Sequence, residues 1–328
     1  MQTCVSIIIP VYNAEPYLDS CLSSVFGQTL QSIEVICIND GSTDRSAAIL
    51  KEWQQKEPRL KILNGTHGGP SQARNMGLSQ AIGDYISFVD SDDMIDPGMM
   101  NAMYQAAHQN NADMVICGLA LEFESPSAYD QGAVNWGKAQ HEGTETACGE
   151  IAGRLRTNVL DKLFRRELIT SHQIRFVEGL RFNEDGVFVW SFLPYCRLIT
   201  FIGQNYYHYL QRSHSAIARI YARQDATVLQ LIPSWEKMEA TLIQAGKQNE
   251  YLPPLLDLIS AHIKHFGQYI PPEHQTEWQN GVTAYLHHIA DTYPALVCQY
   301  RSSHKKQAKI LFSSTGSILK RIYRSIFN

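Results

Sequence analysis

Short apolar runs alternate with segments of helical periodicity over the first third of the chain. Five runs are short, continuous and rich in β-branched residues, and we expect strands at 5–9, 33–38, 60–63, 84–89 and 113–117. The intervening patterns predict helices at 15–28, from a cap at Ser42-Thr43-Asp44 to residue 55, at 70–81 and from Pro97 onward. Apolar strands alternating with helices predict an α/β fold with a mainly parallel sheet and helices on both faces.

Beyond residue 120 the sequence pattern becomes irregular at first and is mostly helical towards the C-terminus. Ser, Pro, Gly and Gln interrupt the pattern over 121–150, which predicts a loop or hairpin excursion. Helical signals return over 150–172, and two aromatic or β-branched runs predict strands. After Ala222 the pattern is mostly helical. The predicted strands are 197–202 and 206–210, and the predicted helices are 226–245, 255–266 and 274–293.

The C-terminal tail, residues 302–328, is basic and has helical periodicity. It carries Lys305, Lys306, Lys309, Lys320, Arg321 and Arg324 and no acidic residue. Its apolar positions are Ile318, Leu319, Ile322, Tyr323, Ile326 and Phe327. A basic amphipathic helix of this kind lies on anionic membrane surfaces. The alternative is a terminal helix that packs its apolar stripe on the protein.

Composition narrows the class of protein. With 328 residues and 44% hydrophobic content the chain can bury a large core, and its net charge of -4 argues against a general nucleic-acid binder. Seven widely spaced cysteines without a C-x-x-C pair indicate reduced thiols in a cytoplasmic protein. We expect no secretory leader and no membrane span, so any membrane substrate would be met at the surface.

Three carboxylates, Asp90, Asp92 and Asp93, follow directly on the apolar run 84–89. Unpaired carboxylates at the end of a buried strand are costly to desolvate, so a positive partner is expected. A hard divalent cation with oxygen ligands is the natural partner, and a metal at a strand end is typical of a phosphate-bearing substrate.

Polar residues also follow the other strands, and the carboxyl ends of parallel strands share one edge of the sheet. Residues 10–13 follow the first strand and 39–44 the second. Asp40 and Asp44 fit turn and cap positions, as Asn-Asp-Gly-Ser is good turn chemistry. The functional alternative is a carboxylate that accepts hydrogen bonds from a base N–H and a ribose hydroxyl. Neither the G-x-G-x-x-G nor the G-x-x-x-x-G-K-[ST] loop is present, which disfavours a dinucleotide dehydrogenase and a P-loop NTPase.

Four segments together resemble family 2 glycosyltransferases, the large inverting group with the GT-A fold. They are 5–13, 34–44, 69–77 and 90–93, and their order and spacing cover about the first 120 residues, with a weaker match to about residue 216. The resemblance implies a donor-binding half at 1–120, an acceptor-side half with the catalytic base at 121–216, a helical region at 217–301 and the tail at 302–328.

The resemblance also implies roles for the residues at the strand ends. The donor would be a UDP-sugar, and its metal Mg²⁺ or Mn²⁺ would be bound by Asp92. Residues expected at the donor are Pro10, Tyr12, Asn13, Asp40, Arg74, Asp90, Ser91 and Asp93, with Asp93 toward the sugar or in a supporting role.

The catalytic base is expected further along the chain, where the family places an acidic pair ahead of a helix. Asp185 matches the base and Glu184 its neighbour. The alternative is a helix N-terminus made acidic to complement the helix dipole. The segment 206–215 resembles the family's aromatic strand and basic loop, in which His208 or Arg212 would touch the diphosphate.

These features predict a bacterial, inverting glycosyltransferase for O-antigen, capsule or lipopolysaccharide synthesis. The Q-x-x-R-W signature of processive synthases is missing, so one sugar per encounter is expected. The acceptor would be a glycan or a polyprenyl-diphosphate-linked saccharide at the cytoplasmic face of the inner membrane, with peripheral contact through the basic tail. Two alternatives are a nucleotidyltransferase, although its Gly-rich, Lys-containing loop is absent, and a non-catalytic protein that binds nucleotide sugars or glycans.

Overall fold

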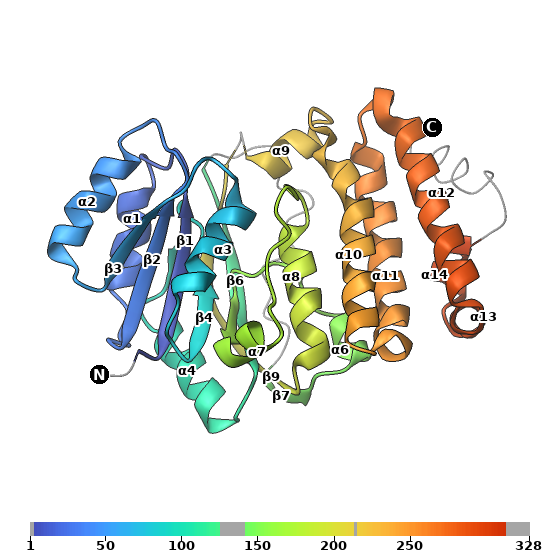
Figure 1. The fold of residues 1–328 in the computed structure, drawn as a ribbon, viewed down its shortest axis with the longest axis horizontal. Coiled ribbons are helices and arrows are strands. Elements are labelled where there is room, and N and C mark those ends of the chain that lie inside the picture. The colour runs from blue at the N-terminus through green and yellow to red at the C-terminus, as the bar shows by residue number, and fades with distance from the viewer. Residues whose placement is uncertain (1–2, 125–141, 213–214, 313–328) are drawn as a thin grey trace. The chain divides into compact units, whose positions relative to one another are not determined.

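The computed structural model describes residues 3–124, 142–212 and 215–312 (Figure 1). The chain forms two compact units. The first comprises residues 1–147 and 157–213, and the second comprises residues 148–156 and 214–328. Each unit has its own buried core, and the predicted site residues all belong to the first.

The first unit is built on a nine-stranded sheet of order β3-β2-β1-β4-β8-β6-β9-β5, with β7 paired to β9. The strands are β1 Val5–Val11, β2 Ile33–Asn39, β3 Leu60–Asn64, β4 Tyr85–Phe88, β5 Met94–Ile95, β6 Met114–Phe123, β7 Gly143–Thr146, β8 Lys162–Arg165 and β9 Leu198–Gln211. Strands β1 to β4 pair in parallel, as predicted. Strand β8 is antiparallel to both of its neighbours, whereas β6 and β9 are parallel to each other.

Helices cover both faces of this sheet (Figure 1). They are α1 Leu18–Phe26, α2 Ser46–Lys56, α3 Pro70–Gln80, α4 Met99–Gln109, α7 Arg166–Ser171, α8 Glu184–Phe192 and the 3₁₀ turn η1 Leu193–Tyr195. Gly77 of α3 lies against Ile8 and Ile38, so α3 packs on the face opposite to α2, which covers Ile62. A Cβ at Gly77 would lie 2.5 Å from Cγ2 of Ile8, which explains the glycine.

The helix predicted over 150–172 is wrong for its middle part. The structure has a short helix, then strand β8 at Lys162–Arg165, then α7. Leu163 and Phe164 of β8 are fully buried between β4 and β6, so pairing in the sheet overrides the helical signal. A four-residue strand is also too short to show a clear periodicity of its own.

Strand β9 also differs from the prediction. The two predicted strands, 197–202 and 206–210, form one strand, Leu198–Gln211, whose register against β6 shifts on either side of Gly118. A β-bulge of this kind bends the strand without ending it. Strands β5 and β7 were not predicted individually, and β7 lies within the predicted excursion.

The second unit is helical, as predicted for this part of the chain. Its helices are α6 Gly149–Ala152, α9 Ala216–Tyr221, η2 Ala226–Gln230, α10 Leu231–Gln244, α11 Gln248–Phe266, η3 Gly267–Tyr269, η4 Pro272–His274, α12 Gln275–Thr292, α13 Pro294–Ser303 and α14 Lys305–Phe312. Trp235 and Trp278 are fully buried in its core, with ring centroids 5.8 Å apart. Helix α11 begins before Pro253 and Pro254, seven residues earlier than predicted.

The structure describes the first part of the basic tail only. In α14 the apolar side chains of Ala308 and Leu311 are buried, and Lys305, Lys306 and Lys309 are exposed. The apolar positions predicted to meet a membrane, 318–327, lie outside the described residues. Among the residues that the structure describes, no helix is long and apolar enough to cross a bilayer.

Candidate active site

The loops after β1 and β2 are held together by side chains at their tips. Asn13, with a positive φ of 48°, accepts a hydrogen bond on Oδ1 from the Thr43 amide at 2.8 Å. Its own amide donates to Oγ of Ser42 at 3.1 Å. Asp44 accepts from the amides of Glu15 and Ser46, at 3.0 and 2.9 Å, so it connects the segment after β1 to the first residue of α2. The two strand ends therefore form one preorganised platform.

Asp40 links this platform to the start of α3. Its carboxylate is buried and accepts hydrogen bonds from the amides of Gly68 at 3.0 Å and Gly69 at 2.7 Å. Gly69 has a φ of 85°, a left-handed conformation that suits glycine. Each carboxylate oxygen retains acceptor capacity, because an ionised carboxylate offers about four lone-pair sites.

Tyr12 presents an aromatic surface beside this carboxylate. The ring is 47% exposed and contacts His67, with the two ring centroids 4.4 Å apart and tilted by 36°. An exposed ring at the end of a parallel strand is suited to stack on a planar base. Pro10, inside β1, is half-buried beneath this loop.

The acidic cluster lies where β4 ends. One oxygen each from Asp90, Asp92 and Asp93 lie within 4.8 Å of one another, a spacing that a single cation can bridge. Ser91 is half-buried between them. Burial, together with the charge of Asp90, raises the pKa of Asp92 to about 6, although the nearby Arg212 opposes this shift.

Asp93 differs from its neighbours because both of its oxygens are used within the protein. Oδ2 accepts from the Tyr207 hydroxyl at 2.7 Å, and Oδ1 accepts from the Leu210 amide at 2.8 Å. Tyr207 is fully buried and also accepts from the Asp90 amide at 3.1 Å. Both oxygens of Asp93 are therefore used by hydrogen bonds, whereas Asp90 and Asp92 each pair with an arginine.

Arg74 of α3 joins the acidic cluster to the acidic pair at the start of α8. Its Nη2 donates to Oδ1 of Asp90 at 2.9 Å, and its Nη1 donates to Oδ1 of Asp185 at 2.9 Å and to Glu184 at 3.3 Å. The residue is only 3% exposed. Its guanidinium lies 5.3 Å from the ring centroid of Phe176. Arg74 therefore reaches a carboxylate, Asp185, that lies 111 positions further along the sequence.

Asp185, in the first turn of α8, has a pKa close to neutral pH. Burial raises its pKa to about 7; Arg74 opposes this shift and Glu184 reinforces it. Oδ2 has one weak partner, the Val159 amide at 3.4 Å. A buried carboxyl group with a pKa near neutral is a candidate general base. Its position also fits a helix N-terminus, because Asp185 lies in the first turn of α8.

The end of β9 brings a cation to the acidic cluster. Nη2 of Arg212 lies 2.8 Å from Oδ2 of Asp92, and its guanidinium is stacked 5.2 Å from the ring centroid of Tyr17. His208 is held instead by two carboxylates, with Nε2 3.0 Å from Asp96 and Nδ1 2.7 Å from Glu122. Burial would lower the pKa of His208, but these two contacts raise it overall. His214 lies outside the described residues.

Two contributors to this site were not identified from the sequence. In the sequence, Tyr207 stands out only as one residue of an aromatic strand, and Asn75, next to Arg74, only as one residue of the motif 69–77. The fully buried position of Tyr207 beside the acidic cluster arises from the pairing of β9 with β5 and β6. No local sequence signal could have indicated it.

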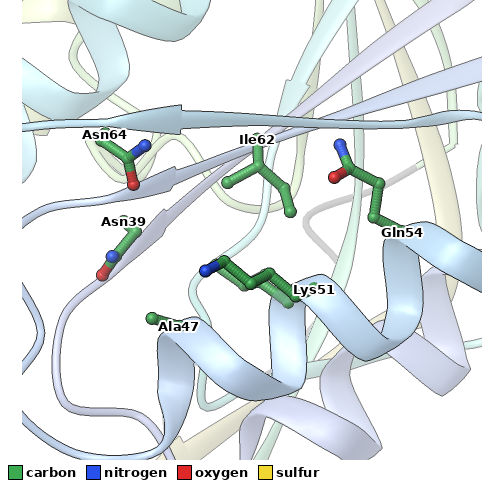
Figure 2. Close-up of a pocket in the computed structure, with 7 residues that line it drawn as sticks. Asn39, Ala47, Lys51, Gln54, Ile62 and Asn64 are labelled. Atoms are coloured by element: carbon green, nitrogen blue, oxygen red, sulfur yellow. The ribbon is translucent and has the colours of Figure 1, made fainter.

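A separate hollow lies between α2 and strands β2 and β3, on the face of the sheet opposite to α3 (Figure 2). It is lined by Asn39, Ala47, Leu50, Lys51, Gln54, Ile62 and Asn64. None of the residues predicted for donor binding or catalysis lines it.

Comparison with known proteins defines the class to which this site belongs. The sequence model of glycosyl transferase family 2 matches residues 6–168. The chain is 32% identical to the glycosyltransferase GlyG of Streptococcus pneumoniae serotype 4 (strain ATCC BAA-334 / TIGR4) over 223 residues, which are 66% of this chain and 73% of GlyG. The chain therefore belongs to glycosyl transferase family 2, and the predicted family is confirmed.

A second relative is EpsJ, an uncharacterized glycosyltransferase of Bacillus subtilis (strain 168). It is 34% identical over 213 residues, 64% of this chain and 62% of EpsJ, so the match spans less than two thirds of that relative. Among solved structures, Staphylococcus aureus TarS 1-349 in complex with UDP-GlcNAc superposes with a TM-score of 0.72 at 21% identity, covering 98% of this chain and 90% of TarS 1-349. The predicted GT-A fold with a mostly helical C-terminal region is confirmed.

Proposed function

We propose that the protein is an inverting glycosyltransferase that moves one sugar from a UDP-sugar to a hydroxyl group of an acceptor. The observation that carries this proposal is the Arg74 bridge, which places Asp185 next to Asp90 at the edge of the sheet where the donor would bind. The proposed base, Asp185, and the proposed donor-binding carboxylate, Asp90, would thereby be positioned by the same guanidinium group, that of Arg74. The complexes of TarS with UDP and with UDP-GlcNAc support a UDP-sugar donor in this fold.

The loops after β1 and β2 would bind the nucleotide. The exposed ring of Tyr12 would stack on uracil, and Asp40 would accept hydrogen bonds from the base or the ribose. Pro10 and Asn13 would shape the same loop, and Ser91 and Asp90 would lie toward the ribose and the sugar. Most of these groups are held by contacts within the protein, so little ordering is needed when the donor binds.

The acidic cluster has the chemistry that Mg²⁺ or Mn²⁺ requires. Asp92 and Asp90 offer hard oxygen ligands within bridging distance, whereas both oxygens of Asp93 already accept hydrogen bonds. Asp92 would hold the ion, and Asp90 would support it. A bound divalent ion supplies positive charge that stabilises the departing diphosphate.

Asp185 would act as the general base. Its Oδ2 would accept the proton of the acceptor hydroxyl as that oxygen attacks the anomeric carbon of the donor, on the side opposite to UDP. Attack from that side inverts the anomeric centre, so an α-linked donor gives a β-linkage. The transition state resembles an oxocarbenium ion, as in glycoside hydrolysis. Glu184 would keep the pKa of Asp185 high through its negative charge.

For the acceptor and the cellular setting, the family resemblance and the basic tail support a further proposal. We infer a glycan or polyprenyl-diphosphate-linked saccharide acceptor in O-antigen, capsule or lipopolysaccharide synthesis, with one sugar added per encounter. The exposed lysines of α14 support peripheral contact with anionic lipid at the cytoplasmic face of the inner membrane. This contact would be electrostatic for residues 305–312, because the apolar side of α14 is buried.

The test is a UDP-release assay with Mn²⁺, a panel of UDP-sugars and a polyprenyl-diphosphate-linked saccharide. We expect acceptor-dependent UDP release with at least one donor, and a product of inverted anomeric configuration by NMR. Asp185→Asn should retain UDP–Mn²⁺ binding and lose transfer. Binding of UDP-sugars without turnover would favour a non-catalytic binding protein, and release of pyrophosphate would favour a nucleotidyltransferase.

A further inference from the structure

Asn75 anchors the segment that carries the acidic pair to helix α3. Its Nδ2 donates to the backbone carbonyl of Phe176 at 2.9 Å, and the Phe176 amide donates to its Oδ1 at 2.9 Å. Nδ2 also lies 3.3 Å from Oε1 of Glu178. A side chain that pairs with both polar groups of one residue fixes the position and the orientation of that backbone, as a neighbouring strand would.

Two further side chains of α3 contact the same segment. Ser71 is fully buried and donates from Oγ to the Leu180 carbonyl at 3.3 Å, and Arg74 binds Asp185. Ser71, Arg74 and Asn75 are spaced at i, i+3 and i+4, so they lie on one face of the helix. The segment from Phe176 to Asp185 is therefore attached to α3 at its beginning, middle and end.

Phe176 connects the Asn75 contact to the base. Its ring stacks on Phe188 with centroids 4.2 Å apart and an interplanar angle of 12°. Phe188 lies one turn after Asp185 in α8. The guanidinium of Arg74, which binds Asp185, lies 5.3 Å from the same ring. A shift of Phe176 would therefore disturb both the helix turn and the cation that orient the base.

We propose that Asn75 is a positioning residue for the catalytic base, which it holds in place through Phe176. This inference rests on the proposed role of Asp185. The hydrogen bonds of Asn75 go to Phe176 and Glu178, whereas the nucleotide is expected at Asp40 and Asp92. Loss of the Asn75 amide should therefore slow transfer and leave donor binding nearly unchanged.

The test compares Asn75→Ala with the wild type, using kcat per UDP-binding site so that any unfolded fraction is excluded. We expect kcat to fall by about tenfold or more, because small displacements of a catalytic group cost that much, while UDP–Mn²⁺ affinity measured by calorimetry changes by less than about twofold. Ser79→Ala is the matched control, since Ser79 is an exposed residue of α3 whose hydroxyl donates within that helix, to the Met76 carbonyl. Its kcat should equal that of the wild type.

Asn75→Asp supplies a second readout if the alanine variant folds poorly. A neutral carboxyl group can restore both bonds to Phe176, whereas the ionised form can no longer donate and faces the Phe176 carbonyl. The usual pKa of an aspartate is about 4, and the facing Phe176 carbonyl and Glu178 would raise it, so the ratio of its kcat to that of the wild type should fall as the pH rises from about 4 to about 7.

A kcat per binding site within about twofold of the wild type for Asn75→Ala, or a pH-independent ratio for Asn75→Asp, would overturn the inference. Failure of the proposed function is recognised separately. If Asp185→Asn retains wild-type turnover, Asp185 is not the base, and the positioning role falls with it whatever the Asn75 variants do.

Discussion

Nη1 of Arg74 and Oδ1 of Asp185 lie 2.9 Å apart, and this ion pair joins helices α3 and α8, which are far apart in the sequence. Arg74 is almost completely buried, and each of its carboxylate partners is at most 28% exposed. One cation therefore pairs with three carboxyl groups in a poorly solvated place. The same pair keeps Asp185 ionisable while burial pushes its pKa upward.

Removing the charge of Arg74 should destabilise the protein strongly. Arg74→Met leaves Asp90, Glu184 and Asp185 without their shared cation, and the loss of one partner of a buried ion pair costs about 3–5 kcal/mol. Urea unfolding followed by circular dichroism measures the change. Arg45→Met is the control, because the pair Arg45–Glu52 is 3.9 Å long and exposed, so little change is expected. Equal stability of the two variants would contradict the view of Arg74 as the shared counter-ion.

The rate of transfer should rise with pH through about 7. Asp185 must be ionised to accept a proton, and burial raises its pKa to about 7, so below that pH the kcat should fall about tenfold per unit. The measurement is kcat against pH at saturating donor, acceptor and Mn²⁺. Glu184→Gln tests the sign: removing a nearby negative charge lowers the pKa of Asp185 and should move the acidic limb to lower pH. A limb that stays in place or moves upward would contradict the role given to Glu184.

The parts of the site that lie at strand ends could be predicted from the sequence, because each lies within a few residues of an apolar run. Asp40 and Asp90 are examples, and the structure places both at the carboxyl edge of the sheet. Their partners could not be predicted from local pattern. Arg74 and Asp185 are 111 positions apart, and Tyr207 and Asp93 are 114 apart. Such pairs depend on how the sheet is assembled, and periodicity carries no information about that.

The fold shows the same division. Strands β1 to β4 are mainly apolar and agree with their predicted positions to within a few residues. Strand β8 was not predicted, because its four residues lie among helix-forming residues. They are stabilised as a strand by pairing with β4 and β6. The predicted domain limits at 120 and 216, and the predicted roles of the donor-side residues, remain predictions.

Arg212 and a divalent ion should compete for Asp92. Nη2 of Arg212 lies 2.8 Å from Oδ2 of Asp92, and two positive groups on one carboxylate repel each other. Arg212→Ala should therefore increase the affinity of the nucleotide-free protein for Mn²⁺ by about two- to fivefold, a small factor because the pair is partly exposed. Calorimetry or Mn²⁺ paramagnetic resonance gives the affinity.

The effect of Arg212→Ala should reverse when UDP is present. A guanidinium displaced from Asp92 by the metal would be available for the diphosphate, so the variant should bind UDP–Mn²⁺ more weakly than the wild type. Arg45→Ala, which alters an exposed arginine of the first unit, should change neither affinity. Weaker Mn²⁺ binding by nucleotide-free Arg212→Ala would refute the competition.

Tyr207 should hold the acidic cluster in place through its hydroxyl group. The hydroxyl donates to Asp93 at 2.7 Å and accepts from the Asp90 amide at 3.1 Å, and the side chain is fully buried. Tyr207→Phe leaves the half-buried Asp90 amide without its acceptor and removes one of the two hydrogen bonds to Asp93, so a loss of about 1–3 kcal/mol is expected in urea unfolding. The neighbouring half-buried tyrosine provides the control, Tyr206→Phe, for which we expect a much smaller change.

Tyr207→Phe also distinguishes two roles for Asp93, namely support of the acidic cluster and direct contact with the donor sugar. If Asp93 only supports the cluster, Tyr207→Phe and Asp93→Asn should both weaken Mn²⁺-dependent UDP binding, because both loosen the backbone that presents Asp90 and Asp92. If Asp93 instead binds the sugar, Asp93→Asn should weaken binding of the UDP-sugar more than that of UDP, whereas Tyr207→Phe should affect both ligands equally. Since both oxygens of Asp93 accept hydrogen bonds within the protein, we expect the first result.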